Sequence, residues 1–355
     1  MENFFISKPD FADFIKEISR DFVTFYLKEK PARFDWKQGK RKLLYWQKYD
    51  DNLEGLSLSG VRAQDSLKQF VFSCKEKVSD DFSDPKNRKK PVLLVGAKNC
   101  DLQGLDITDF VFTQGDFKDP FYIKKRQDMF IIASDCANPL ETCFCLALDI
   151  NPYPEKNYDL GLCDIKDGYI VEVATQRARN YIAEYKNKFS LASNAQLQRK
   201  RDIRDTASSD VAFNISKYGV PRKNELQGVV EKCFDSQIWK DEAKTCVECG
   251  SCNFICPTCH CFFLGDSKEE NKNIRRKIWD ACLYKDFAVV AGGANPRKRL
   301  FQRLRNRYDK KFAFFPNTLG IIACTGCGRC ISGCPGKIDI RRILKNMAAE
   351  AKAAV

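Results

Sequence analysis

The sequence predicts an α+β protein in which an N-terminal α/β domain is followed by a helical domain organised around cysteines. Two short apolar runs, residues 91–95 and 129–133, have the length and composition of strands that are buried in an α/β sheet. Residues 175–240 are rich in Arg, Lys, Glu, Gln and Ala and contain few turn signals, which predicts linking helices. Cysteines then recur with the same short spacing in two runs, at residues 246–256 and 324–334. The predicted domains are residues 1–90, 91–220 and 221–355.

The first segment, residues 1–90, predicts an α/β segment of unassigned role. Apolar residues from 10 to 27 have helical spacing, whereas the aromatic runs at 43–46 and 70–72 indicate short strands. Residues 79–90 are polar and charged, and this composition predicts a loop.

Two cysteine motifs with the same spacing, C-x2-C-x2-C-x3-C-P, occupy residues 246–257 and 324–335. In two-cluster ferredoxins this spacing lets three cysteines of one motif bind one 4Fe-4S cluster while the fourth binds the other cluster. Gly250, Gly326 and Gly328 would let the backbone approach the sulfides. The predicted ligands of the first cluster are Cys246, Cys249, Cys252 and Cys334. The predicted ligands of the second cluster are Cys256, Cys324, Cys327 and Cys330.

About 67 residues separate the two motifs, which is far more than in small β-type ferredoxins. The spacing therefore predicts an α-helical ferredoxin-like dicluster domain, with helices at 274–282 and 298–307 and a terminal helix at 338–355. The alternative is a pair of zinc ribbons, in which C-x2-C pairs close a tetrahedral site. Zinc has no use for a third and fourth cysteine at these spacings, so the cluster interpretation is favoured.

The N-terminal residues lack a basic region followed by a long apolar run, so we expect no secretory signal. No stretch approaches the ~18 apolar residues of a membrane span. These features predict a cytoplasmic protein whose cysteines bind metal instead of forming disulfides. The sequence also lacks G-x-G-x-x-G and P-loop motifs, so we expect no nicotinamide, flavin or ATP site on this chain. The single histidine, His260, excludes multi-histidine metal sites.

The net charge of +13 is concentrated locally, because residues 262–311 hold fourteen Lys and Arg against six Asp and Glu. Such a run is commonly a solvated face. It also suits a docking face for an acidic partner subunit, or cations that offset the negative charge of the clusters and raise their reduction potentials. Nucleic acid binding is disfavoured, because no recognised nucleic-acid module accompanies the charge.

A third group of cysteines follows the predicted strands of the α/β domain, before a further predicted strand at 169–173. Its members are Cys100, Cys136, Cys143 and Cys145. In open α/β sheets, ligands bind at the carboxyl ends of the strands, where Cys100 and Cys136 are expected. The four thiols therefore suggest a third metal centre. The alternative is that they are unrelated buried thiols, since free cysteine is commonly buried.

Several of these segments together resemble one family of iron-sulfur subunits, which serves both the sulfhydrogenases, as their β subunit, and the anaerobic sulfite reductases. The resemblance extends from about residue 91 to 343, in the same order along the chain. Its motifs are residues 96–101, 136–145, 256–261, 279–282, 291–297 and 324–335. Where members of the family often carry a histidine, this chain has Ala294, which argues against proton handling there.

The resemblance implies an electron-transfer subunit with no catalytic residues of its own. Its partners would be a flavin subunit that oxidises NAD(P)H and a catalytic subunit of the NiFe hydrogenase or sulfite reductase type. The resemblance also favours the third cluster. It leaves open whether Cys259, Cys261 and Cys282 line the clusters or pack around them.

Two other functions stay open from the sequence. One is a free-standing iron-sulfur enzyme with an open-site cluster near Cys259, His260 and Cys261. The other is a zinc-stabilised module that binds nucleic acid through the basic segment.

Overall fold

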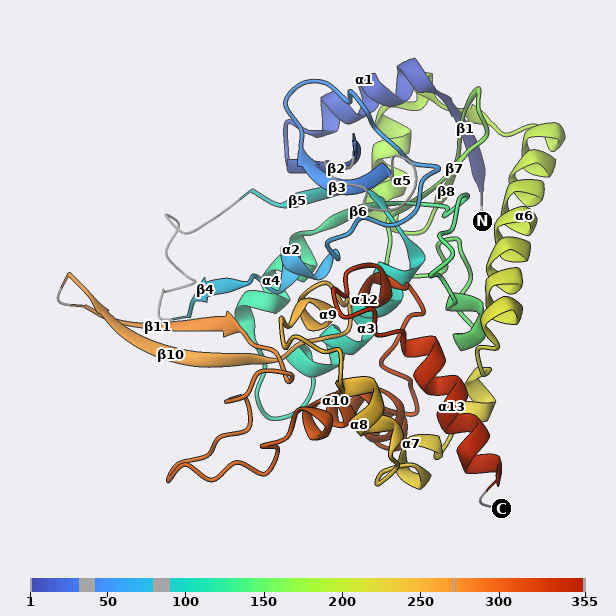
Figure 1. Ribbon diagram of the computed structural model, residues 1–355. Helices are drawn as coiled ribbons and strands as arrows, with labels where there is room; N and C mark the ends of the chain where they lie inside the picture. Colours follow the sequence, from blue (N-terminus) through green and yellow to red (C-terminus); the bar gives the residue numbers. More distant parts are fainter. Residues whose placement is uncertain (1, 32–41, 79–89, 271, 354–355) are drawn as a thin grey trace. The chain divides into compact units, whose positions relative to one another are not determined.

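The computed structural model describes residues 2–31, 42–78, 90–270 and 272–353 (Figure 1). Most of the predicted loop at 79–90 lies outside these ranges. The described residues form two compact units with interleaved segments. The first unit falls within residues 1–71, 81–140 and 151–210, and the second within 72–80, 141–150 and 211–355. These bounds cut across the predicted segments, because residues 1–90 and 91–220 both supply strands to the sheet of the first unit.

The first unit is built on one eight-stranded sheet with the order β3-β2-β5-β6-β7-β8-β1-β9. Its strands are β1 (Asn3–Ser7), β2 (Val23–Pro31), β3 (Lys42–Lys48), β5 (Val92–Ala97), β6 (Phe130–Ser134), β7 (Leu160–Asp164), β8 (Gly168–Val173) and β9 (Ser190–Leu191). Strands β2, β5, β6 and β7 run parallel, whereas β3, β8, β1 and β9 extend the sheet in antiparallel pairs. The strands predicted at 43–46, 91–95, 129–133 and 169–173 are confirmed.

Helices cover both faces of this sheet. They are α1 (Lys8–Ile18), α2 (Lys68–Val71), α3 (Asn99–Thr113), α4 (Pro120–Asp128), α5 (Gln176–Glu184) and α6 (Asn194–Tyr218), with a 3-10 turn at Lys186–Lys188. Helices α1 and α5 bury their apolar residues against one face, in a core that includes Val95, Ile132 and Val171. Leu197 and Ile203 of α6 pack with Ile170 on the opposite face, as the period of two along β8 requires.

Two sequence predictions in this unit need correction. The helix predicted for residues 10–27 ends at Ile18, because Val23 already belongs to β2, which pairs with β3 and β5. The strand predicted at 70–72 is wrong, since residues 68–71 form the helical turn α2. Phe70 packs its ring on Phe25 and Trp46, at centroid distances of 4.8 and 5.5 Å. Three consecutive apolar residues define no period, so tertiary packing decides the backbone.

The second unit is mostly helical. Its helices are α7 (Val229–Lys232), α8 (Ile238–Ala243), α9 (Ser251–Phe254), α10 (Leu300–Asp309), α11 (Phe315–Leu319), α12 (Arg329–Ser332) and α13 (Ile340–Ala353), with 3-10 turns at Cys145–Leu148 and Lys223–Leu226 and a π-helical turn at Lys310–Phe314. They enclose a core in which Trp239, Tyr308, Ile343 and Met347 are almost fully buried. The helices predicted at 298–307 and 338–355 are thereby confirmed as α10 and α13.

The helix predicted at 274–282 is wrong. These residues fall largely in β11 (Lys272–Trp279), which pairs with β10 (Phe262–Glu269) and with β4 (Lys75–Lys77) in a three-stranded antiparallel sheet. The β10–β11 hairpin extends away from the helices of this unit (Figure 1). The partner strand β4 lies about 200 residues earlier in the chain, so local periodicity could not reveal the pairing. No helix in the described ranges is long and apolar enough to cross a membrane.

A buried ionic network joins α6 to the sheet of the first unit. The Arg204 guanidinium donates to Asp135 at 2.8 Å and to Glu172 at 2.5 Å, and Lys200 donates to Glu172 at 2.8 Å. Burial opposes ionisation of Glu172, but hydrogen bonds from Arg204 and Lys200 outweigh it and lower the pKa of that carboxyl. The network therefore depends on Arg204 to compensate two largely buried carboxylates.

We expect Arg204→Met to lower the free energy of unfolding of the first unit by about 3–5 kcal/mol, because it leaves two buried carboxylates without their main partner. Urea unfolding monitored by circular dichroism would measure the loss. Arg201→Met is the matched control, since Arg201 is exposed on the same helix and, among the described residues, its side-chain hydrogen bonds go to Gln198. Equal losses in the two variants would contradict the role given to Arg204.

Candidate iron-sulfur site

The first cysteine motif and the last cysteine of the second motif line one cavity in the second unit. Cys246, Cys249, Cys252 and Cys334 line it, together with Cys330, Arg307 and Tyr308. Gly250 has a φ of +69° and begins the one-turn helix α9, which carries Cys252. The loop before it is held by Arg303, whose buried guanidinium donates to Glu248 at 2.7 Å.

The second motif and the last cysteine of the first motif line another cavity. Its lining includes Cys256, Cys324, Cys327 and Cys330, with Phe144, Arg307, Lys311 and Thr325. The local design is repeated, because Gly328 has a φ of +67° and begins the one-turn helix α12, which carries Cys330. The second cavity thus contains three cysteines of the second motif and one of the first, and the first cavity contains three cysteines of the first motif with Cys334 and the shared Cys330 of the second. Both groupings are compatible with the crossed ligand assignment, in which Cys330 belongs to the second cluster.

The remaining lining of these cavities fits an anionic iron-sulfur cluster. Arg307 lines both cavities, is only 4% exposed and leaves its Nε without a hydrogen-bond partner among the described residues. The hydroxyl of Thr325 in the second cavity is buried and equally unpartnered within those residues. Buried polar groups normally have partners. Sulfide and thiolate sulfur would supply acceptors for both groups, as in other clusters tuned by hydrogen bonds to sulfur.

Burial dominates the acidity of several lining thiols. It raises the pKa of Cys252 to about 12 and that of Cys324 to about 12. Cys256 behaves in the opposite way, because a hydrogen bond from the Cys259 thiol, helped by the charge of Lys311, holds its pKa well below the usual range despite burial. Iron coordination deprotonates a thiol outright, so a bound cluster would remove the cost that burial places on the other cysteines.

A row of buried cations runs along α10 and the π-helical turn that follows it. Its members, Arg303, Arg307 and Lys311, are spaced four residues apart and therefore share one helix face. The Lys311 ammonium donates to Thr258 Oγ1 at 2.7 Å, to the carbonyl of Ala323 at 2.9 Å and to Cys256 Sγ at 3.4 Å. Burial opposes its charge, but the sulfurs of Cys256 and Cys259 raise the pKa of Lys311. The sequence indicates only a charge run here, although the spacing of four residues is visible in it.

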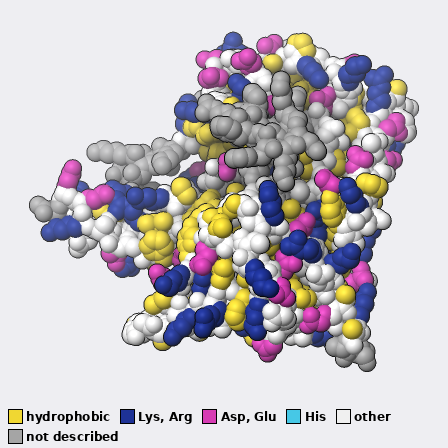
Figure 2. Space-filling model, in the orientation of Figure 1, with side chains coloured by type: hydrophobic (Ala, Val, Ile, Leu, Met, Phe, Trp, Pro, Cys, Tyr) yellow, Lys and Arg dark blue, Asp and Glu magenta, His cyan; other side chains and the backbone are white. Residues whose placement is uncertain are grey.

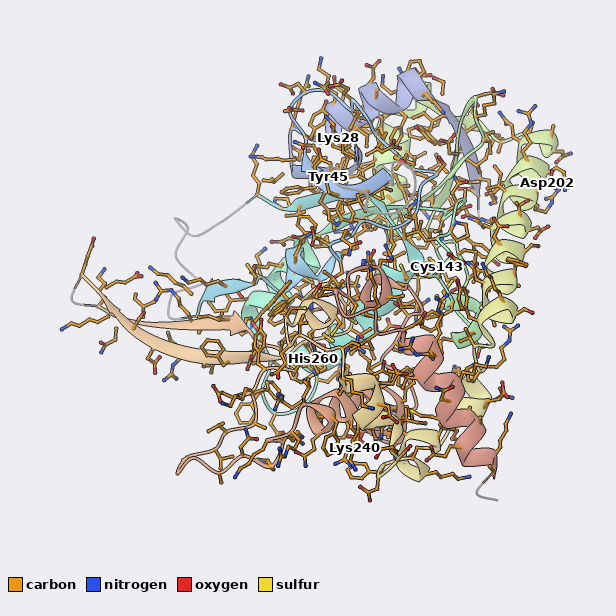
Figure 3. All side chains as sticks on the ribbon, in the orientation of Figure 1. Lys28, Tyr45, Cys143, Asp202, Lys240 and His260 are labelled. Atoms are coloured by element: carbon orange, nitrogen blue, oxygen red, sulfur yellow. The ribbon has the colours of Figure 1, made fainter. Side chains whose placement is uncertain are left out.

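Cys259, Cys261 and Cys282 pack as a sulfur group beside Cys256. The buried amide of Asn253 donates to Cys282 Sγ at 3.1 Å and to Cys259 Sγ at 3.8 Å. Within the described ranges, no three His, Cys, Asp or Glu side chains form a group suited to a single metal ion. We assign no metal to this sulfur group. His260 (Figure 3) approaches the carbonyl of Thr258 through Nδ1 at 3.1 Å and lies edge-on to Phe315, so its contacts are those of a packed side chain.

The segment Glu141–Ile150 carries Cys143 and Cys145 into the second unit. The Phe144 amide donates to the carbonyl of Gly326 at 2.8 Å, and Cys143 Sγ (Figure 3) lies 3.9 Å from the carbonyl of Cys327. A Cβ atom at Gly326 would lie 2.5 Å from Cys145 Cα, and one at Gly328 would lie 2.2 Å from the carbonyl of Thr142. These two glycines therefore make room for this segment of the chain, a role that the motif alone did not reveal.

Cys100 and Cys136 lie in the first unit, where Cys100 is in the first turn of α3 and Cys136 follows β6. Lys98, which is only 1% exposed, is close enough to both cysteines to feel their charge, and it donates to Ser134 Oγ at 2.8 Å and to the carbonyl of Asp135 at 2.7 Å. Burial lowers the pKa of Lys98 to about 8, although Cys136 and Asp135 oppose the change. The four cysteines of the predicted third centre are thus divided between the two units, and their joint role stays a prediction.

Comparison with known proteins defines the class of the chain. Residues 245–338 match the family model described as "4Fe-4S dicluster domain". This chain is therefore an iron-sulfur protein with a dicluster domain in its second unit. It is similar to "Sulfhydrogenase 2 subunit beta" of Pyrococcus furiosus, with 29% identity over 253 residues that cover 71% of this chain and 72% of the relative. The resemblance found in the sequence is confirmed.

We expect Gly328→Ala to lower the iron content by roughly four atoms per chain, because the added methyl group would displace the second motif from residues 142–145. Iron and acid-labile sulfide measured on anaerobically purified protein would show the loss. Gly320→Ala is the matched control. Gly320 also has a positive φ, but the described residues leave the space around its Cβ position open. Full iron content in Gly328→Ala, or an equal loss in Gly320→Ala, would contradict the steric explanation.

Proposed function

We propose that this chain is the electron-transfer iron-sulfur subunit of a cytoplasmic multi-subunit oxidoreductase. The observation that carries the proposal is the pair of adjacent cysteine-lined cavities, which share Cys330 and Arg307 in their walls. In the proposed assignment, Cys246, Cys249, Cys252 and Cys334 bind the first 4Fe-4S cluster. Cys256, Cys324, Cys327 and Cys330 bind the second. Each cluster would supply one-electron redox steps, and their proximity would give a short path between them.

The residues of the chain hold and tune the clusters in this proposal. The thiols would bind iron, the apolar walls would limit contact with water, and Arg307 and Lys311 would offset negative charge. None of these roles makes or breaks a bond in a substrate. The chain would therefore have no turnover of its own and would depend on partners for chemistry.

The proposed partners are a flavin subunit that takes hydride from NAD(P)H and a catalytic subunit, of the NiFe hydrogenase or sulfite reductase type. The name of the relative, a β subunit of a sulfhydrogenase, supports an assembly of several subunits. A docking surface is available on the β10–β11 hairpin, where Phe262, Phe263 and Leu264 are 39–54% exposed. Figure 2 shows Lys and Arg side chains on this hairpin with Asp and Glu side chains among them, a mixture of apolar and charged groups that suits a protein partner. We do not favour nucleic acid as the partner.

A third 4Fe-4S cluster, bound by Cys100, Cys136, Cys143 and Cys145, is part of the proposal. Its support is the placement of Cys100 and Cys136 at the carboxyl ends of neighbouring parallel strands, with Lys98 buried beside them. Such a cluster would extend the electron path beyond the dicluster domain.

The relay function predicts a protein that is redox-active but catalytically silent by itself. Anaerobically purified chain should be brown and show electron paramagnetic resonance signals of reduced clusters after dithionite treatment. It should not turn over hydrogen, NADPH or sulfite. Turnover of any of these by the isolated chain would instead support a free-standing enzyme with an open-site cluster. Zinc in place of iron would contradict both functions.

The third cluster predicts about twelve irons per chain, and Cys136→Ala should remove about four of them. Cys74→Ala is the control, because Cys74 is an exposed thiol outside every proposed ligand set. About eight irons in the parent protein, unchanged by Cys136→Ala, would restrict the clusters to the dicluster domain.

A further inference from the structure

The two cluster cavities differ in the charge that surrounds them. The first cavity has one cationic side chain in its lining, Arg307. The second has three, since Lys311 and Arg329 join Arg307 there. All three are at most 4% exposed, so water screens their charges poorly. A reduced cluster carries one more negative charge than an oxidised cluster, and nearby buried cations stabilise the reduced form.

Cys256 and Cys334 are the two cysteines assigned to the cluster of the other motif. The hydrogen-bond donors to their sulfurs also differ in charge. Cys256 Sγ accepts from the Lys311 ammonium at 3.4 Å, and the Cys259 thiol also hydrogen-bonds to it. Cys334 Sγ accepts from the neutral backbone amide of Ile338, also at 3.4 Å. Hydrogen bonds from charged donors are roughly twice as strong as those from neutral donors. Donors to cluster sulfur raise the reduction potential, so the cluster held by Cys256 gains more from them.

The two cavities also differ in how far their cysteines are exposed to solvent. Cys249 of the first cavity is exposed, whereas no cysteine of the second cavity is. Contact with water at Cys249 also favours the reduced form of the first cluster, because a high dielectric stabilises the added negative charge, and this effect opposes that of the cations around the second cavity. Lys311 lies within a buried site, where a unit charge has a much larger effect on the reduction potential than it would have in water. The exposed edge at Cys249 instead marks the side on which an external redox partner can approach most closely.

We propose that the cluster bound by Cys256, Cys324, Cys327 and Cys330 has the higher reduction potential of the two clusters and therefore holds a single added electron. Lys311 is the residue that sets the order of the two potentials. This inference rests on the proposed electron-transfer function. A reduced flavin on a partner would give one electron to the first cluster, on the Cys249 side. That electron would then leave the first cluster, which is reoxidised, and enter the second, which is reduced. Only an electron moves between the clusters, and no bond is formed or broken.

The test is a redox titration of the full chain, followed by electron paramagnetic resonance, with Lys311→Met as the variant. The higher of the two dicluster potentials should fall by at least about 59 mV, which is a tenfold change in the ratio of reduced to oxidised cluster for one electron. The lower potential should move less. Lys310→Met is the matched control and should shift neither, because Lys310 is exposed and points its ammonium at the Phe314 ring.

Cys249→Ala identifies the couples, since it removes a ligand of the first cluster only. The dicluster couple that it leaves intact should be the higher one of the parent protein. Lys311→Arg keeps the charge and should keep the potential near the parental value. If Lys311→Met loses iron, Lys311→Gln replaces it as the variant that removes the charge. A higher couple that disappears in Cys249→Ala, or that stays unshifted in Lys311→Met with full iron content, would overturn the proposal. A parent chain without clusters would instead refute the proposed function itself.

Discussion

The second unit depends on one geometric constraint, which is that each cysteine motif must reach two cavities. The fourth cysteine of each motif lies in the cavity that holds the first three of the other. The motifs must therefore pack closely and in one register. Left-handed glycines at 250 and 328 begin the short helices that turn the chain at the required points. At Gly326 and Gly328 the packing is so close that residues 142–145 occupy the volume a side chain would need. If the clusters bind as proposed, their binding and the folding of this unit would be coupled.

Charge imposes a second constraint on the same unit. Arg303, Arg307 and Lys311 are buried along one face of α10 and its π-helical extension, where an unpaired cation would be strongly destabilising. Arg303 is compensated by Glu248 and by backbone carbonyls. Arg307 has one carbonyl contact, to Cys252 at 3.3 Å, and an unpartnered Nε within the described ranges. In the proposed assignment, the negative charge of the clusters would supply the compensation that Arg307 needs, so the basic segment and the cysteine motifs would be electrostatically coupled.

What the sequence could predict depended on how far apart the interacting residues lie. The cysteine motifs are local, so their spacing identified the dicluster domain, and the strands at 91–95 and 129–133 were recognisable from their apolar composition alone. β11 was mistaken for a helix because its partners are a hairpin strand and the distant β4. The segment Glu141–Ile150 follows Cys136 closely in sequence but belongs to the other compact unit. Neither the strand pairing of β11 nor the placement of this segment leaves a local signal in the sequence, because both are decided by tertiary packing.

The cation row explains why a helix lies between the two motifs at all. A ferredoxin needs only enough chain to bring its second motif back beside its first, yet residues 257–323 include α10 as well as a hairpin. Spacing of four residues places Arg303 at the loop of the first motif, Arg307 between the cavities and Lys311 at Cys256. Helix α10 and its π-helical extension thus position three charges, from the loop of the first motif to the wall of the second cavity. A row of buried cations of this kind needs a rigid element. Each cation must be held within hydrogen-bonding distance of its own partner in a site with little water. The insert therefore does more than connect the motifs, since it makes two cavities of the same ligand type electrostatically different.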